Sequence, residues 1–247
     1  MAMRTANPAL NAKTFQRAAG YSGGVMTIEG TVNKTGFLLL TLMVPATWMW
    51  GKVGAGDMGA ALPWVILGMV GGLISALVAI FKKEWAPFAA PVYAACQGLV
   101  LGAISRMYEI QTRGIVIQAV ALTAGTLLCL LFAYRSGMIR ATENFKLGVV
   151  AATGGIAVVY LLGWILSFFG IGIPYIHGNG LIGIGFSLFV VAIAALNLVL
   201  DFDFIERGAE VGAPKYMEWY AAFGLMVTLI WLYVEILRLL SKLNSRR

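Results

Sequence analysis

The residues of this sequence that could carry chemistry are carboxylates at the edge of, or inside, long apolar segments. The stretch LNLVLDFDFIERGAE at 196–210 runs from apolar side chains directly into acids. Asp201 follows LNLVL without a break, and Glu235 lies within LIWLYVEILRLL. An ionised side chain at membrane depth is costly, and such residues usually mark ion or proton pathways. Asp201 and Glu235 are therefore the first candidates for a functional site in a chain that has only eleven acidic residues.

The acids of 201–210 also have a simpler interpretation as the solvated end of a membrane helix. That interpretation is favoured for Asp203, Glu206 and Glu210, which lie beyond the apolar run. Asp201 borders the run directly, so for this residue a solvated position and a functional position at the hydrocarbon boundary both stay open.

Glu235 likewise has two interpretations, as a station on an ion path or as the partner of Arg238. Arg238 follows three residues later, on the same helical face. Glu235 lies nineteen residues after Tyr216, which is roughly 28 Å along a helix. This places Glu235 toward the opposite side of the membrane, so a direct pair with Asp201 is not expected.

The elements that must position these acids are membrane helices, because 60% of the 247 residues are hydrophobic and only 12% are charged. A bilayer core of about 30 Å needs roughly 20 apolar residues per helix, whereas the alternating polarity of a membrane barrel is absent. We predict an all-α polytopic membrane protein with a polar cytoplasmic tail over 1–33 and a seven-helix transmembrane domain over 34–247. The seven predicted spans are 36–53, 60–81, 85–106, 114–134, 146–169, 178–201 and 216–240.

Several other classes of protein are disfavoured by the sequence. Lys and Arg give a net charge of +7 but are scattered rather than clustered with aromatic residues, so no nucleic-acid partner is expected. Cys96 and Cys129 fall within apolar segments and predict no disulfide. A single histidine, His177, and the absence of catalytic motifs argue against a metal cofactor and against an enzyme.

The basic residues indicate how the chain is oriented in the membrane. With seven spans, eleven of the eighteen Lys and Arg fall on the side of the N-terminus and seven on the other. Basic residues concentrate on the cytoplasmic side of membrane proteins. We therefore predict a cytoplasmic-membrane protein whose N-terminus lies in the cytoplasm.

Several stretches together resemble the Bax inhibitor-1/YccA family, in its bacterial branch with a long N-terminal tail. They include NPALNAKTF and MTIEGTVNKTG in the tail, GLVLG in the third span, DFDFI, and IERGAEVGAPKYMEWYAAFGLMVTLIWLYVEILRLL. The similarity covers nearly the whole chain and implies a seven-helix fold. It also implies a pH-sensitive calcium leak channel, in which an Asp of the sixth helix and an Asp of the seventh share a proton. A basic residue at the end of the second helix latches that pore.

The resemblance assigns roles to particular residues. The family's D-x-x-x-I motif matches residues 201–205, so Asp201 is implied as the pH sensor. Thr228 stands where the family has the second Asp, and a threonine cannot share a proton as a carboxylate does. Either Glu235 acts as a second station along the path, or Glu218, in the first turn of the seventh helix, pairs with Asp201 from the same side.

The latch and a calcium site are implied in the same way. Lys82 and Lys83 stand in place of the expected Arg, and either could form an ion pair with Asp201, although not a bidentate one. Asp201 and Asp203 are expected to bind calcium weakly and transiently, because calcium prefers six to eight oxygen ligands.

The function expected from these features is a pH-sensitive leak channel for calcium or another cation. One alternative is a regulator that binds and restrains a membrane-anchored AAA protease or another membrane partner. A second is a proton-coupled transporter of a small solute. No cofactor is expected other than calcium as the transported ion, and no oligomeric state is implied.

Overall fold

The computed structural model describes residues 24–54, 58–169, 178 and 180–245, and these residues are almost entirely helical. The elements are α2 (Ile28–Gly54), α3 (Met58–Phe81), a short 3-10 helix η3 (Lys83–Trp85), α4 (Ala86–Gln111), α5 (Ile115–Arg135), α6 (Glu143–Phe168), α8 (Leu181–Glu210) and α9 (Met217–Asn244). Within the described ranges, seven helices are long and apolar enough to cross a membrane. The predicted all-α polytopic fold with seven spans is confirmed.

Two helix boundaries differ from the prediction in ways that matter for the site. α2 begins at Ile28, so residues 28–33 of the expected tail are helical, while residues 1–23 lie outside the described part of the chain. α8 continues to Glu210, nine residues beyond the predicted end at Asp201. The helix persists because Phe202 and Ile205 are buried on one face while polar residues occupy the other. Asp201 therefore lies inside a helix rather than at its end.

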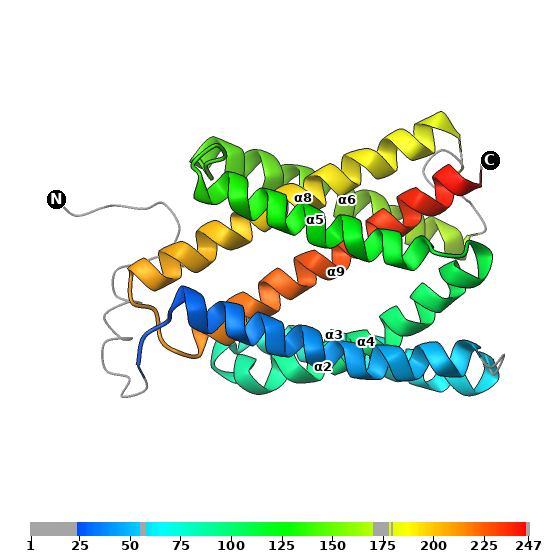
Figure 1. Cartoon of the computed structure of the whole chain (residues 1–247), viewed down its shortest axis with the longest axis horizontal. Helices are drawn as coiled ribbons and strands as arrows, with labels where there is room; N and C mark the ends of the chain where they lie inside the picture. Colours follow the sequence, from blue (N-terminus) through cyan, green and yellow to red (C-terminus); the bar gives the residue numbers. More distant parts are fainter. Residues whose placement is uncertain (1–23, 55–57, 170–177, 179, 246–247) are drawn as a thin grey trace.

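The helices form two groups on either side of α9, as Figure 1 shows. α2, α3 and α4 lie on one side, α5, α6 and α8 lie on the other, and α9 packs against α2, α4, α5 and α8. Half of the α9 span is buried (50%), as is most of the α4 span (56%), compared with 11% for α5 and for α6. A polar side chain on α9 is therefore much more shielded than one on α5 or α6.

Small residues allow α2 and α4 to approach closely. A side chain at Gly98 or Gly102 of α4 would overlap the carbonyl oxygens of Leu42 and Ala46 on α2. Gly98 and Gly102 form a GxxxG spacing, which is typical of membrane helices that pack closely. At Gly154 and Gly155 of α6, in contrast, an added methyl group would have no neighbouring atom within 4 Å, so these two glycines do not serve a close helix contact.

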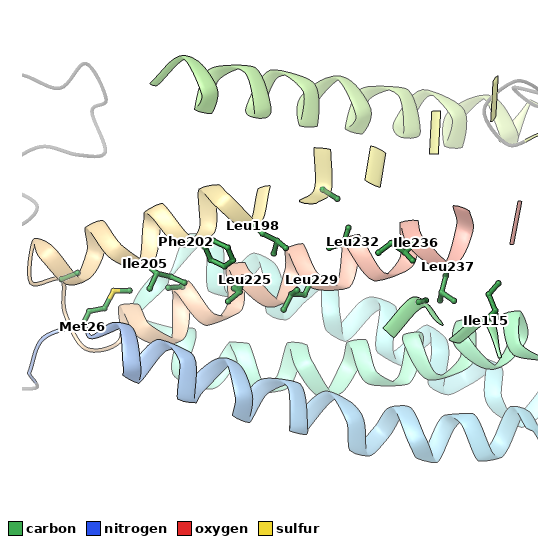
Figure 2. Packing of buried hydrophobic residues seen from close by; sticks show 14 residues of the cluster. Met26, Ile115, Leu198, Phe202, Ile205, Leu225, Leu229, Leu232, Ile236 and Leu237 are labelled. Carbon is green, nitrogen blue, oxygen red and sulfur yellow. The ribbon is translucent and has the colours of Figure 1, made fainter. Parts of the chain in front are cut away.

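The pairing of α8 with α9 forms the largest apolar cluster (Figure 2). Leu198, Phe202 and Ile205 of α8 face the apolar stripe of α9, which comprises Leu225, Leu229, Leu232, Ile236 and Leu237. We call the end of the bundle where α2 and α9 begin and α8 ends the N-terminal face, and the end where α9 finishes the C-terminal face.

Candidate functional site

Asp201 lies on α8 and faces α9, opposite Thr228. The Thr228 side chain lies within interaction range of the Asp201 carboxyl group, and its hydroxyl donates to Gly224 O at 3.3 Å. Gly224, one turn earlier on α9, adjoins this carboxyl group, since a methyl group built there would lie 4.0 Å from Asp201 Oδ1, at ordinary van der Waals contact. The structure thus brings together the two positions that the family resemblance relates, with threonine in place of the second carboxylate.

The second oxygen of Asp201 is the unusual feature of this site. Oδ2 is buried and has no hydrogen-bond partner. The nearby side chains of the α8–α9 cluster, such as Leu198, Phe202 and Leu225, are apolar. A buried polar atom without a partner is costly and calls for a functional explanation. A proton or a cation at Oδ2 would supply the missing interaction.

Asp203 faces away from Asp201 and has a different environment. Its Oδ2 lies 2.7 Å from Lys146 Nζ and 3.0 Å from Arg207 Nε, so it ties α6 to α8. Residues two apart on a helix point in nearly opposite directions. The expected weak calcium site shared by Asp201 and Asp203 is therefore not formed, and within the described residues no group of three or more His, Cys, Asp or Glu side chains could hold a metal ion.

Glu218 does not pair with Asp201, contrary to one of the two arrangements considered from the sequence. It is fully buried and accepts hydrogen bonds from Thr27 N (2.9 Å), Thr27 Oγ1 (2.9 Å) and Lys215 Nζ (2.8 Å), and from Lys34 Nζ. Gly30 makes this possible, since any side chain there would overlap the Glu218 carboxylate. Glu218 therefore joins the start of α2 to the start of α9 instead of serving Asp201.

Lys82 and Lys83 do not form the expected latch in this structure. Both are exposed beyond the end of α3, where Lys82 Nζ lies 5.4 Å from the ring centre of Trp85 and Lys83 Nζ lies 5.1 Å from that of Tyr220. Among the described residues, neither lysine is ion-paired with Asp201, because Asp201 is directed between α8 and α9 rather than toward the surface at α3. The lysines that meet a buried carboxylate at the N-terminal face are Lys34 and Lys215, which are both paired with Glu218.

Glu235 lies toward the C-terminal face in a second buried polar cluster. Only 2% of the residue is exposed, and Oε1 accepts hydrogen bonds from Arg238 Nη1 (2.8 Å) and Tyr160 Oη (3.0 Å). Arg238 Nη1 also donates to Tyr160 Oη at 2.8 Å. Oε2 is buried without a partner. Glu235 therefore faces the interior and is also the partner of Arg238, so the two interpretations of this residue are compatible.

Two members of this second cluster are not apparent from the acids alone. Tyr160 of α6 supplies the hydroxyl that bridges Glu235 and Arg238. Lys242 of α9 is buried, and its Nζ donates to Gly183 O (3.0 Å) and Ser187 Oγ (2.8 Å) on α8. The spacing of Thr228, Glu235 and Lys242 at seven-residue intervals places all three on one stripe of α9, and this periodicity is the signal that identifies Lys242.

A separate apolar groove lies between α2, α4, α5 and α9, with a volume of about 420 Å³. Its few polar residues include Ser105 and Tyr233, whose hydroxyls are hydrogen-bonded to each other at 2.7 Å. None of the carboxylates discussed above lines it. The groove suits hydrocarbon rather than an ion.

Comparison with known proteins agrees with this arrangement. No curated protein and no solved structure matches the chain. The family described as Bax inhibitor 1 like matches residues 7–245, which include both polar clusters and all the helices that the structure describes. With seven membrane-length helices and a match over almost its entire length, this chain belongs to the Bax inhibitor 1 like family.

Proposed function

We propose that this protein is a slow cation leak of the cytoplasmic membrane, with calcium as the principal ion, and that protonation of Asp201 controls the leak. The observation that carries the proposal is the buried, unpartnered Oδ2 of Asp201, set opposite Thr228 between two membrane helices. Ionisable groups inside membrane bundles commonly mark ion paths. Family membership is in accord with this role.

The chemistry follows from the two charge states of Asp201. When ionised, the side chain places a negative charge among the apolar side chains between α8 and α9, which we call the apolar layer, and it attracts a cation. When protonated, the carboxyl carries no charge, and the apolar layer opposes the ion. Few other oxygens surround the group, so a calcium ion would be held weakly and released easily, as conduction requires. Flux should therefore rise with pH as Asp201 loses its proton.

Glu235 would form a second station nearer the C-terminal face. Its charge is already balanced by Arg238 at 2.8 Å, so its attraction for a passing cation is weaker than that of an ionised Asp201. We therefore assign the pH response to Asp201 and an accessory role to Glu235.

The test is calcium and potassium flux into proteoliposomes that contain the purified protein, measured from about pH 5 to about pH 8. Calcium flux should increase with pH and exceed that of protein-free vesicles. Absence of flux across the whole range would contradict the proposal. The alternative, a regulator that restrains a membrane-anchored AAA protease, would then be the better account, with the N-terminal residues 1–33 as its binding segment.

A further inference from the structure

The segment Gly24–Thr27, which we call the strap, crosses the N-terminal face between the ends of α8 and α9. Met26 N donates to Ala213 O at 2.7 Å, and Lys215 N donates to Gly24 O at 3.2 Å. These two bonds flank an antiparallel bridge between Val25 and Pro214. The strap is thus paired through its backbone with the turn that joins α8 to α9.

The side chain of Met26 fills the space beneath this pairing. Only 2% of Met26 is exposed, and it belongs to the α8–α9 cluster together with Ile205, Ala213 and Leu225. Figure 2 shows Met26 at the end of that cluster, beside Ile205. Gly208 provides the notch, because a methyl group there would lie 2.8 Å from Met26 Sδ. Because Met26 packs against Gly208, it covers the end of the α8–α9 pair at the N-terminal face.

The closure lies directly between Asp201 and the N-terminal face. Ile205 is one turn beyond Asp201 on α8, and Gly208 is about 10 Å beyond it at 1.5 Å per residue. On α9, Leu225 adjoins Gly224, the residue beside Asp201 Oδ1. Met26 therefore lies between Asp201 and the N-terminal face along the α8–α9 pair.

Charged groups hold the strap in place at its other end. Thr27 donates from both its backbone N and its hydroxyl to Glu218 Oε1, at 2.9 Å each, and Lys34 and Lys215 balance the charge of Glu218. The Met26 side chain that fills the space beneath the strap is flexible and unbranched. A closure of this kind can be withdrawn without separating the helices.

We propose that the strap is the gate on the N-terminal face, with Met26 as the plug that separates Asp201 from the aqueous phase. The inference rests on the proposed function for its role in ion passage, but the closure itself can be tested without flux. Release of the strap exposes the Asp201–Thr228 pair, and locking the strap keeps that pair covered.

The first experiment measures access to Thr228. In a background with Cys96→Ala and Cys129→Ala, a Thr228→Cys reporter is placed in nanodiscs, where both faces are open to solution. The rate of modification by a cationic, membrane-impermeant thiol reagent is then measured. Met26→Ala should raise this rate by about tenfold or more, because loss of a buried methionine side chain leaves a cavity in the closure.

Matched controls separate the plug from general loosening. Met26→Leu keeps the apolar volume and should label as slowly as the parent, and Val25→Ala alters an exposed neighbour on the same strap and should also have no effect. Equal labelling rates for Met26→Ala and the parent would overturn the inference. Rapid labelling in the Val25→Ala control would also overturn it, since the effect would then not depend on the plug.

The second experiment locks the strap and measures flux. Val25 and Pro214 form a non-hydrogen-bonded antiparallel pair, whose Cα atoms are about 4.5 Å apart in such pairs, within the range that a disulfide spans. In the same cysteine-free background, oxidised Val25→Cys/Pro214→Cys should reduce calcium flux severalfold at the highest pH, and a reducing agent should restore it.

The two experiments distinguish failure of the gate from failure of the leak. Flux that is unchanged by the oxidised lock would overturn the strap as a gate while leaving the cation leak intact. Faster labelling of Met26→Ala without flux in any variant would support the closure and overturn the leak.

Discussion

Two carboxylates in the half of the bundle near the N-terminal face have contrasting surroundings, because Glu218 is fully buried whereas Asp201 is half-buried with one buried oxygen. Glu218 accepts four hydrogen bonds, two of them from lysine ammonium groups. Asp201 has the side chain of Thr228 and an oxygen with no partner. A buried polar group whose bonds are made supports the fold, whereas one with an unmade bond destabilises it. We infer from the contrast that Glu218 is an architectural residue, and we propose that the unpartnered oxygen of Asp201 is retained for function.

The largest expected effect on stability is that of Glu218→Gln. The substitution leaves Lys34 and Lys215 without their counter-charge and places an amide against ammonium donors. We expect the free energy of unfolding in detergent to fall by about 3 kcal/mol. Glu210→Gln, at an exposed position on α8, should change it by less than about 0.5 kcal/mol. Equal stability of the two variants would remove the contrast between Glu218 and an ordinary surface acid.

Glu235→Gln should have an intermediate effect. The amide oxygen can still accept from Tyr160, but Arg238 loses its counter-charge, and the Arg238 side chain is one-third exposed (33%), so water replaces part of the interaction. We expect a loss of about 1–2 kcal/mol in the free energy of unfolding.

A double-variant cycle with Arg238→Gln sharpens this prediction. If the two side chains stabilise the fold mainly through each other, Glu235→Gln with Arg238→Gln should cost clearly less than the sum of the single changes. Strictly additive losses would show that Glu235 and Arg238 act independently, despite their 2.8 Å separation.

Asp201→Asn should be tolerated or mildly stabilising. The amide has nearly the same shape as the carboxyl, can bond with Thr228 and carries no charge into the apolar layer. We expect the free energy of unfolding to stay the same or rise by about 1 kcal/mol. A loss comparable to that of Glu218→Gln would mean that Asp201 is also an architectural residue.

The smallest effect is expected for Lys82→Gln with Lys83→Gln. Both side chains are exposed, and neither is ion-paired with Asp201 among the described residues. Stability should change by less than about 0.5 kcal/mol, and calcium flux should match that of the wild type. A raised basal flux would restore these lysines as a latch.

The sequence predicts the helices well because hydropathy over twenty residues is a strong local signal. It also predicts that Asp201 and Thr228 belong together, because the resemblance relates those two positions. The predicted end of α8 is nine residues too early, since the amphipathic turns after Asp201 are less apolar than the span before them. Because of that error, the sequence places Asp201 at the end of a helix, whereas the structure places it within α8.

The partners of the other acids depend on contacts that no local pattern contains. Glu218 meets Thr27 and Lys34, which are 191 and 184 residues away in the sequence. Glu235 meets Tyr160 across 75 residues. Distance along the chain hides these pairings. The family resemblance points to Lys82 and Lys83 as basic partners, whereas Lys34 and Lys215 are the lysines that reach the buried Glu218 carboxylate.

The pH dependence of calcium flux through Asp201→Asn, compared with wild type in the same proteoliposomes, tests the central claim most directly. Wild-type flux should rise from about pH 5 to about pH 8 as the carboxyl at position 201 ionises. The Asn variant should stay at the low, acid-side level throughout, since it cannot acquire the charge. Profiles that rise equally in both proteins would contradict the assignment of Asp201 as the controlling group.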